Sequence, residues 1–364
     1  MRGAINLSSK AVGTTNENPP VGAIITKYID GEDVIIGTGV TSKTGRPHAE
    51  RNALENVVKS GYTLDDIKGA TLYVTLEPCC HYGKTAPCTE AIIKSGIKHV
   101  VIALKDIDSR VCGKGINALN NAGITTELGI LQVEAYNILA PYFINKLYNR
   151  SFVTLKLAIG KNNVIGSRII SNFSISNNLS KKISHHLRCC YGAILIGINT
   201  AILDNPILTC RIEGVENQKL TRIVLDSKLR IDLDSNLVKT AKQQELIVIC
   251  LPQLDMLKKK LLTDKGAKIF EIEDIYDIKN LLSLLYKNNI YSVLVEGGSE
   301  IAKSFINSGC VDKFAIFNSN VTIDKEEIYA PCLNISKNYQ KIEEMQLQDN
   351  MFKQWIRVEK CLLV

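Results

Sequence analysis

The chain contains His48-Ala49-Glu50 and, further on, Glu77-Pro78-Cys79-Cys80-His81-Tyr82-Gly83-Lys84-Thr85-Ala86-Pro87-Cys88, and these two segments decide the fold of its first half. One histidine and two cysteines make a three-ligand zinc site, and catalytic zinc keeps its fourth position for water. Zinc lowers the pKa of that water to about 7, and a neighbouring carboxylate must then carry the proton to the leaving group. We therefore predict that His48, Cys79 and Cys88 bind zinc and that Glu50 transfers the proton.

The spacing of these residues leaves alternatives for the ligand set. His48 and Cys88 each follow a proline, so we place both at the start of a helix, where the helix dipole favours a thiolate or hydroxide. The pattern H-x-E followed by P-C is the signature of zinc nucleobase deaminases, but the spacing from Cys79 to Cys88 is wider here. Cys80 or His81 could therefore replace a predicted ligand or complete a structural zinc site. In the remaining alternative, the cysteines are unrelated core residues and the histidine lies on the surface.

Composition limits the class of protein. The 364 residues are 45% hydrophobic, which is enough for more than one buried core. A net charge of +7 suits a phosphorylated metabolite but is too dilute for a dedicated nucleic-acid surface. No apolar run reaches the ~18 residues of a membrane span, and the N-terminus lacks a secretory signal. We expect a cytoplasmic protein that binds neither nucleic acid nor membranes, and whose scattered cysteines, such as Cys112, Cys189, Cys210 and Cys361, are free and buried.

Strand and helix signals alternate along the first part of the chain and start again after a connector at residues 148–151. We therefore predict two α/β domains, residues 1–147 and 148–364. In the first we expect a hairpin of strands 21–29 and 34–40, helices that begin at Pro47 and Pro87, helices 115–121 and 131–147, and strands 70–76 and 98–104. In the second we expect strands 152–159, 192–196, 221–225, 246–249, 268–272, 291–295 and 313–317, helices 277–286 and 300–308, and a loop near 172–178.

Several further motifs occur in a fixed order along the chain. Residues 78–88 read P-C-x-H-x-G-x-T-x-P-C, residues 18–22 read N-P-x-V-G, and Asp106 precedes Gly113-Lys114-Gly115. Residues 193–211 read A-I-L-x-G-x-x-T-x-x-x-D-x-P-x-L-T-x-R, and the segments 222–227 and 295–298 follow. Together these motifs resemble the bifunctional riboflavin-biosynthesis enzymes, in which a pyrimidine deaminase is fused to a 5-amino-6-(5-phosphoribosylamino)uracil reductase.

This resemblance implies a cytidine-deaminase-like α/β/α sandwich followed by a dihydrofolate-reductase-like α/β domain. It implies zinc-dependent deamination of 2,5-diamino-6-(5-phosphoribosylamino)pyrimidin-4(3H)-one and then NADPH-dependent reduction of the ribosyl side chain to ribityl. The expected cofactors are Zn²⁺ and NADPH, the partner is a phosphorylated pyrimidine, and we expect a homo-oligomer. The implied substrate-binding residues are Asn18, Lys84, Asn172, Arg188, Leu208, Arg211 and Glu296. The implied cofactor-binding residues are Ala158, Ser174, Thr200, Asp204, Ser227, Gly297 and Gly298.

The physical character of these residues agrees with the resemblance in part, and the chain also departs from it. Arg188 and Arg211 are guanidinium forks of the type that grips a sugar phosphate. However, residues 160–163 read G-K-N-N where the family has S-L-D-G, and Asn172 and Ser174 stand where it has Ser and Trp. One alternative is therefore a deaminase whose second domain binds ligand without reducing it. Another is a tRNA-editing deaminase on the same zinc fold, which the cysteine spacing argues against.

Overall fold

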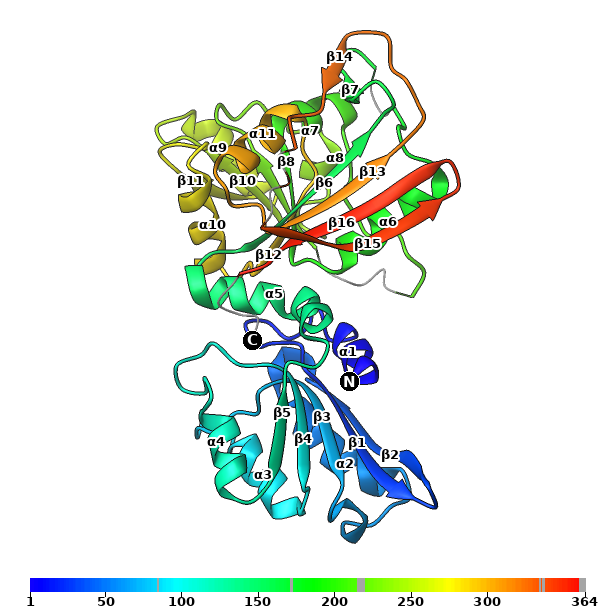
Figure 1. The fold of residues 1–364 in the computed structure, drawn as a ribbon. Coiled ribbons are helices and arrows are strands. Elements are labelled where there is room, and N and C mark those ends of the chain that lie inside the picture. Colours follow the sequence, from blue (N-terminus) through cyan, green and yellow to red (C-terminus); the bar gives the residue numbers. More distant parts are fainter. Residues whose placement is uncertain (84, 171–172, 215–219, 334, 336–337, 360–364) are drawn as a thin grey trace. The chain divides into compact units, whose positions relative to one another are not determined.

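The computed structural model describes the chain except for residues 84, 171–172, 215–219, 334, 336–337 and 360–364 (Figure 1). It divides into two compact units, of which the first consists of Met1–Asn149 with Val358 and Glu359, and the second of Arg150–Arg357. Each unit has its own sheet. Among the described residues, no helix is both long enough and apolar enough to cross a membrane.

The described residues of the first unit form a five-stranded sheet in the order β2-β1-β3-β4-β5. Its strands are β1 (Gly22–Ile29), β2 (Glu32–Val40), β3 (Thr71–Leu76), β4 (His99–Leu104) and β5 (Thr125–Leu128). The hairpin β1–β2 turns at Asp30 and Gly31, both with positive φ, which is the turn geometry that matches strand twist. β1 also pairs with β3 in antiparallel orientation, whereas the pairs β3–β4 and β4–β5 are parallel. The predicted hairpin and strands are confirmed within one residue, apart from the second hairpin strand, which begins two residues earlier, at Glu32, whereas β5 was not predicted.

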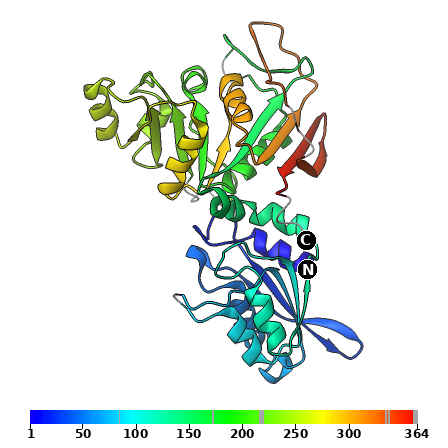
Figure 2. The same cartoon turned by 60° about the vertical axis from the view of Figure 1, so that its left-hand side comes forward.

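Helices cover both faces of this sheet (Figures 1 and 2). On one face lie α1 (Arg2–Ser9) and α5 (Gln132–Tyr148), and on the other lie α2 (Ala49–Lys59), α3 (Cys88–Ser95) and α4 (Lys114–Asn121). The predicted helix starts at both prolines are confirmed, because His48 and Pro87 are the residues that cap α2 and α3. Gly96 ends α3 in the left-handed conformation that favours glycine. Helix α1 was not predicted.

The second unit is built on a larger sheet, which has nine strands among the described residues, in the order β11-β10-β9-β8-β12-β6-β13-β16-β15. The parallel strands are β6 (Phe152–Ile159), β8 (Ala193–Gly197), β9 (Thr221–Leu225), β10 (Leu246–Cys250), β11 (Lys268–Glu271), β12 (Ser292–Val295) and β13 (Lys313–Asn318). An antiparallel hairpin, β15 (Tyr339–Leu347) and β16 (Asn350–Arg357), continues the sheet beyond β13. A separate pair consists of β7 (Val164–Ser167) and β14 (Glu327–Tyr329).

The central strands of the second unit are buried on both faces, as parallel strands between helices must be. Ala193 and Leu195 of β8 belong to one hydrophobic cluster, while Ile194 and Ile196 belong to the cluster on the opposite face. The helices of this unit are α6 (Asn178–Cys189), α7 (Ile198–Asp204), α8 (Asn236–Lys239), α9 (Met256–Asp264), α10 (Ile278–Lys287) and α11 (Ser299–Asn307). All seven predicted strands are present, whereas β7, β14, the β15–β16 hairpin and four of these helices were not predicted.

The cysteines correct one expectation. Cys189 at the end of α6 and Cys210 form a disulfide, with their Cα atoms 6.1 Å apart, so the prediction of free thiols is wrong for this pair. Cys112 is exposed rather than buried. Composition could not give either result, because pairing and exposure depend on tertiary proximity. Cys361 lies outside the described residues.

Candidate active sites

Helix α2 brings His48 and Glu50 close to the sheet because two glycines of β2 leave room for it. A Cβ atom on Gly39 would lie 2.1 Å from the carbonyl oxygen of Ala49, and one on Gly37 would lie 2.6 Å from that of Ala53. Glycine is therefore required where the helix crosses the strand. His48 has extended backbone angles and stands immediately before the helix, so Glu50 lies in its first turn.

The three predicted ligands come together from two helix starts and the end of a strand. His48 Nδ1 lies 3.6 Å from Cys79 Sγ and 3.4 Å from Cys88 Sγ, and all three ligand atoms lie within 4.8 Å of one another. With Zn–S and Zn–N bonds of about 2.3 and 2.0 Å, the N–S edge of a zinc tetrahedron is about 3.5 Å. The donor set and its spacing therefore fit zinc. Cys80 Sγ instead contacts the carbonyl oxygen of Arg110 at 3.5 Å, outside this cluster.

The electrostatics of this cluster shift the pKa values of Cys79 and Glu50 in opposite directions. The hydrogen bond from Cys88, opposed by burial and assisted by His48, lowers the pKa of Cys79 to about 4. Glu50 is 4% exposed, and burial together with the nearby Cys79 raises its pKa to about 7 despite the opposing effect of His48. A carboxyl group with such a pKa can both accept and donate a proton near neutrality.

Sequence reasoning missed Glu77, whose carboxylate connects the start of the zinc loop to the backbone before and within α4. Its Oε2 accepts the N–H groups of Asp106 and Gly113 at 3.2 and 2.9 Å, and its Oε1 accepts that of Ile116 at 3.1 Å. The carboxylate therefore caps the start of α4. A Cβ atom on Gly115 would lie 2.2 Å from the carbonyl oxygen of Pro78, which explains the glycine there. The sequence did contain a signal for this role, because Glu77 is an acidic residue between the end of the apolar strand β3 and the zinc ligand Cys79.

Two arginines on either side of the motif His48-Ala49-Glu50 donate hydrogen bonds to the loop that leads to Cys88. Arg46 Nη1 donates to Thr85 Oγ1 at 2.7 Å, and Arg51 Nη2 donates to the carbonyl oxygen of Ala86 at 2.9 Å. The predicted substrate residue Asn18 packs against Gly45, just before the cis Arg46-Pro47 bond. Lys84 lies outside the described residues.

In the second unit, the predicted substrate residues Arg188 and Glu296 are already joined. Arg188 Nε and Nη2 donate to Glu296 Oε1 and Oε2 at 2.9 and 3.0 Å, and Lys156 Nζ lies 3.7 Å from Oε2. Burial alone would raise the pKa of Glu296, but Lys156 and Arg188 lower it to about 2. The Arg188 fork is thus occupied by a carboxylate, whereas Arg211 is exposed. Sequence reasoning missed Lys156, and the signal was a lysine within an otherwise apolar strand.

Leu208 is buried and holds a left-handed backbone with φ of 57°. It precedes Thr209, whose carbonyl oxygen accepts a hydrogen bond from Arg188 Nη1 at 3.3 Å. This contact places the segment with Leu208 and Arg211 beside the Arg188–Glu296 pair. The structure therefore gathers four of the predicted substrate residues, while Asn172 lies outside the described residues.

The predicted cofactor residues lie mostly at the carboxyl ends of neighbouring parallel strands. Gly297 and Gly298 connect β12 to α11, and Thr200 lies in the first turn of α7 after β8. A Cβ atom on Gly298 would lie 3.8 Å from Thr200 Oγ1, so the two turns adjoin. Helix starts with glycine turns at this edge of an α/β sheet suit the phosphates of a dinucleotide. Ser227 follows β9 at the same edge.

The other predicted cofactor residues are dispersed. Ala158, near the end of β6, packs against the small cluster formed by Val164, Ile175 and Ile323. Asp204 ends α7 and is partly buried. Ser174 is exposed, and its hydroxyl donates to the carbonyl oxygen of Ser176 at 2.8 Å. Ser174 therefore bonds to its own loop.

The unusual G-K-N-N segment forms an ordered turn between β6 and β7. Gly160 N–H donates to the carbonyl oxygen of Val164 at 2.8 Å, and Asn163 has a φ of 62°. Asparagine tolerates this left-handed conformation better than other residues with a side chain, so Asn163 can replace the glycine of the family pattern. Asn162 Nδ2 donates to the carbonyl oxygen of Ile323 at 2.7 Å. The departure from the pattern thus preserves a turn at this position.

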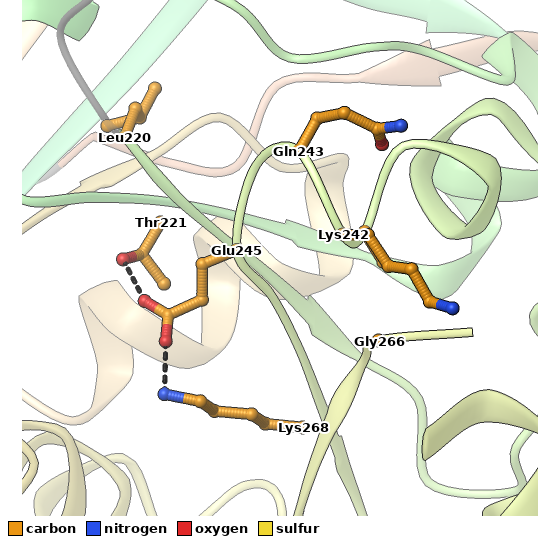
Figure 3. Close-up of a pocket in the computed structure, with 8 residues that line it drawn as sticks. Leu220, Thr221, Lys242, Gln243, Glu245, Gly266 and Lys268 are labelled. Atoms are coloured by element: carbon orange, nitrogen blue, oxygen red, sulfur yellow. Dashed lines mark hydrogen bonds and ion pairs between the residues drawn. The ribbon is translucent and has the colours of Figure 1, made fainter. Parts of the chain in front are cut away.

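A pocket of about 490 Å³ lies elsewhere in the second unit, at the amino ends of β9 and β11 (Figure 3). Glu245 accepts hydrogen bonds there from Thr221 and Lys268, while Lys242 and Gln243 lie on the loop beside them. None of the predicted site residues lines this pocket. We therefore place the candidate sites at the zinc cluster and at the carboxyl edge of the larger sheet.

Comparisons with known proteins cover both units. A family model described as the cytidine and deoxycytidylate deaminase zinc-binding region matches residues 1–104, and one described as the RibD C-terminal domain matches residues 163–337. The riboflavin biosynthesis protein RibD of Aquifex aeolicus is 37% identical over 317 residues, covering 87% of this chain and 85% of that protein. The Bacillus amyloliquefaciens protein of the same name is 34% identical, covering 95% and 90%.

Solved structures agree with these matches. A diaminohydroxyphosphoribosylaminopyrimidine deaminase/5-amino-6-(5-phosphoribosylamino)uracil reductase from Thermotoga maritima is 31% identical, with a TM-score of 0.82, and the alignment covers 98% of this chain and 97% of that chain. RibD of Acinetobacter baumannii is 28% identical, with a TM-score of 0.78 and 98% coverage of both chains. The predicted fold class, a deaminase-like α/β/α sandwich followed by a reductase α/β domain, is confirmed.

Proposed function

The chain belongs to the RibD family of bifunctional riboflavin-biosynthesis enzymes, and from this premise we propose which of its residues carry out the two reactions. The protein is a zinc-binding deaminase and a reductase in one chain, so neither the tRNA-editing alternative nor the ligand-binding alternative is favoured. The cofactors are zinc and a nicotinamide dinucleotide phosphate. We propose residues 1–147 as the deaminase domain and residues 148–364 as the reductase domain.

In the first domain, we propose that His48, Cys79 and Cys88 hold zinc and that the substrate is 2,5-diamino-6-(5-phosphoribosylamino)pyrimidin-4(3H)-one. When bound, the ion supplies Lewis-acid activation of a water molecule. Glu50 accepts the proton of the attacking water and delivers it to the departing amine, which leaves as ammonia. Asn18 and Lys84 contact the substrate. The observation that supports this assignment is the buried Glu50 carboxyl in the first turn of α2, two residues after His48, beside three atoms spaced for zinc.

Glu50→Gln tests the proton-transfer role. The variant should keep its zinc while the rate of ammonia release falls by roughly 10²–10⁴-fold, because glutamine cannot carry the proton. Elemental analysis measures the metal and a coupled ammonia assay measures the rate. Glu55→Gln, which changes an exposed acid on the same helix, should behave like the wild type. A Glu50→Gln enzyme of full activity would remove Glu50 from the mechanism.

In the second domain, we propose that NADPH supplies the hydride that converts the ribosyl side chain into ribityl. Glu296, kept ionised by Lys156 and Arg188, accepts hydrogen bonds from sugar hydroxyl groups, and Arg211 binds the phosphate. The remaining substrate contacts are Leu208 and Asn172. The cofactor contacts are Ala158, Ser174, Thr200, Asp204, Ser227, Gly297 and Gly298. The support for this proposal is that Arg211 is the exposed fork beside the partly buried Arg188–Glu296 pair.

Product identification separates the two reactions. Without NADPH, the enzyme should release the deaminated ribosyl compound, and with NADPH it should release the ribityl compound with one NADPH oxidised per product. A chain that yields only the deaminated compound at saturating NADPH would contradict the reductase proposal. We further propose that the enzyme works in the cytoplasm as a homo-oligomer on this phosphorylated pyrimidine, and light scattering would measure the assembly.

A further inference from the structure

The segment that leads to Arg211 contains a residue in an unfavourable backbone conformation. Leu208 has a φ of 57°, in the left-handed region, which a residue with a side chain keeps only when its surroundings impose it. Leu208 is buried, whereas Arg211, three residues later, is exposed. The contacts that hold the backbone at Leu208 therefore determine where the chain carries the Arg211 fork.

Three consecutive carbonyl groups of this segment are each bound by a different side chain. Arg222 Nη1 donates to the carbonyl oxygen of Ile207 at 3.3 Å, and Gln244 Nε2 donates to that of Leu208 at 3.4 Å. The next carbonyl group along the chain accepts the hydrogen bond from Arg188 described above. Arg188 belongs to the proposed substrate site, but Arg222 and Gln244 have no part in the proposed chemistry.

Arg222 lies near the start of β9 and is fully buried. Burial alone lowers its pKa, to about 10, so the guanidinium is still charged at neutral pH, and among the described residues no carboxylate pairs with it. Its Nη1 also donates to Thr240 Oγ1 at 2.6 Å, and Nη2 donates to the carbonyl oxygens of Thr240 at 3.1 Å and of Gln244. Because a buried cation must keep its donors bonded, Arg222 ties the Ile207 carbonyl group to the loop at residues 240–245.

Gln244 connects the same loop to the segment a second time. Its Nε2 donates to the carbonyl oxygen of Leu220, just before β9, at 2.8 Å as well as to that of Leu208. Its own carbonyl oxygen accepts the hydrogen bond from Arg222. The two residues therefore form one network, since the guanidinium fixes the backbone of the residue whose side chain holds Leu208.

We infer that Arg222 and Gln244 are positioning residues of the reductase, which act through Leu208 to place Arg211 for the substrate phosphate. This inference rests on the proposed role of Arg211 in the second domain. A guanidinium binds a phosphate through two parallel hydrogen bonds, so the contact depends on the exact position of the fork. A displacement of about 1 Å can cost up to ~10²-fold in rate. Holding the segment in place before binding also reduces the loss of entropy on binding.

Kinetics of single and double variants test the inference, because a residue that acts through Arg211 has no effect once the Arg211 fork is removed. The reductase reaction of the full-length, zinc-loaded protein is measured with the deaminated ribosyl compound and NADPH as varied substrates. Gln244→Met keeps the length of the side chain without its N–H donors and should raise KM for the ribosyl compound by about 5–20-fold. The value of kcat and the KM for NADPH should change by less than about twofold.

Arg211→Ala removes the fork itself and should raise the same KM by about 10–100-fold. The double variant Gln244→Met/Arg211→Ala should differ from Arg211→Ala by less than about twofold. A purely structural role of Gln244 predicts instead that the two effects multiply and that kcat falls. Arg222→Lys keeps the charge without the fork and provides a second variant, which should raise KM for the ribosyl compound in the same way. Fluorescence of Trp355 checks that each variant is folded.

Gln243→Met is the matched control. Gln243 is the exposed neighbour of Gln244 on the same loop and lines the pocket of Figure 3, so its replacement should leave both KM values unchanged. The inference is overturned if KM for the ribosyl compound keeps its wild-type value in Gln244→Met and Arg222→Lys, if Gln243→Met raises it equally, or if the effects of Gln244→Met and Arg211→Ala multiply. A wild type that oxidises no NADPH, or an Arg211→Ala variant with unchanged KM, would instead contradict the proposed function of the second domain.

Discussion

Replacing Glu77 with glutamine tests whether the acid before the zinc loop also holds α4 in place. The Glu77 side chain is 3% exposed and accepts three backbone N–H groups, those of Asp106, Gly113 and Ile116. Glutamine has the same shape, but one of its two terminal atoms is an NH₂ group that cannot accept. Whichever way the amide is turned, at least one buried N–H therefore loses its acceptor and faces another donor.

The magnitude follows from the hydrogen bonds that change. A hydrogen bond to a charged group contributes about 1.5–3 kcal/mol, and an unpaired buried donor costs about 1–3 kcal/mol, so we expect a loss of roughly 3 kcal/mol in the free energy of unfolding of the first unit. For a unit of this size each kcal/mol shifts the midpoint by about 2–4 °C, which gives a decrease of roughly 10 °C. The zinc ligands are retained, so the metal content of the folded protein should not change.

Two signals report the units separately. Release of zinc to a coloured chelator follows unfolding of the first unit, and fluorescence of Trp355, the single tryptophan of the chain, follows the second. Glu77→Gln should lower the midpoint of zinc release and leave the fluorescence transition in place. Glu55→Gln provides the comparison, because Glu55 is exposed on α2. Equal zinc-release midpoints for the two variants would refute the reasoning.

Three further predictions concern the ligand set and the second unit. Cys88→Ser should lower the zinc content measured by elemental analysis and Cys80→Ser should not; the opposite result would exchange their roles. Arg150→Met removes the bidentate partner of the buried Asp312, so denaturant titration should show a loss of about 3–5 kcal/mol in the second unit, and a change under about 1 kcal/mol would contradict this. Because the folded pKa of Glu296 is about 2, below its ordinary 4.5, the stability that it contributes is complete above pH 4.5 and is lost as the pH falls toward 2. Fluorescence-monitored acid unfolding should therefore be less steep in Glu296→Gln, and identical profiles would remove this carboxylate as a source of acid sensitivity.

The sequence predicted best where one local signal decides the structure. The β1–β2 hairpin follows from apolar alternation around Asp30-Gly31, and the starts of α2 and α3 follow from the prolines that stand just before each helix. Elements without such a signal were missed. The edge strand β15 carries mostly charged and polar residues that stay exposed, so it has no apolar pattern to detect.

In the candidate sites too, residues in local motifs were predicted, whereas contacts that depend on the tertiary fold were missed. Two short motifs contain His48, Glu50, Cys79 and Cys88, and the residue types in these motifs indicate a zinc site without knowledge of the fold. The contact between Lys156 and Glu296 arises only because β6 pairs with β12, with Leu155 opposite Val295 in register. Periodicity identifies both strands but cannot give their order in the sheet, so the lysine had no visible partner in the sequence.

Glu50 and Glu296 show how surrounding charges shift the pKa of the same type of side chain in opposite directions. Glu50 is buried and Glu296 is partly buried, and burial alone would raise the pKa of each. At Glu50 the neighbouring Cys79 thiolate adds to that effect, so the pKa rises to about 7 and the carboxyl group can exchange a proton. At Glu296 the cations of Lys156 and Arg188 reverse it, so the pKa falls to about 2 and the group remains a fixed acceptor. In the proposed reactions, Glu50 must exchange a proton and Glu296 must accept hydrogen bonds from the sugar, so the charges around each carboxylate suit the role that we propose for it.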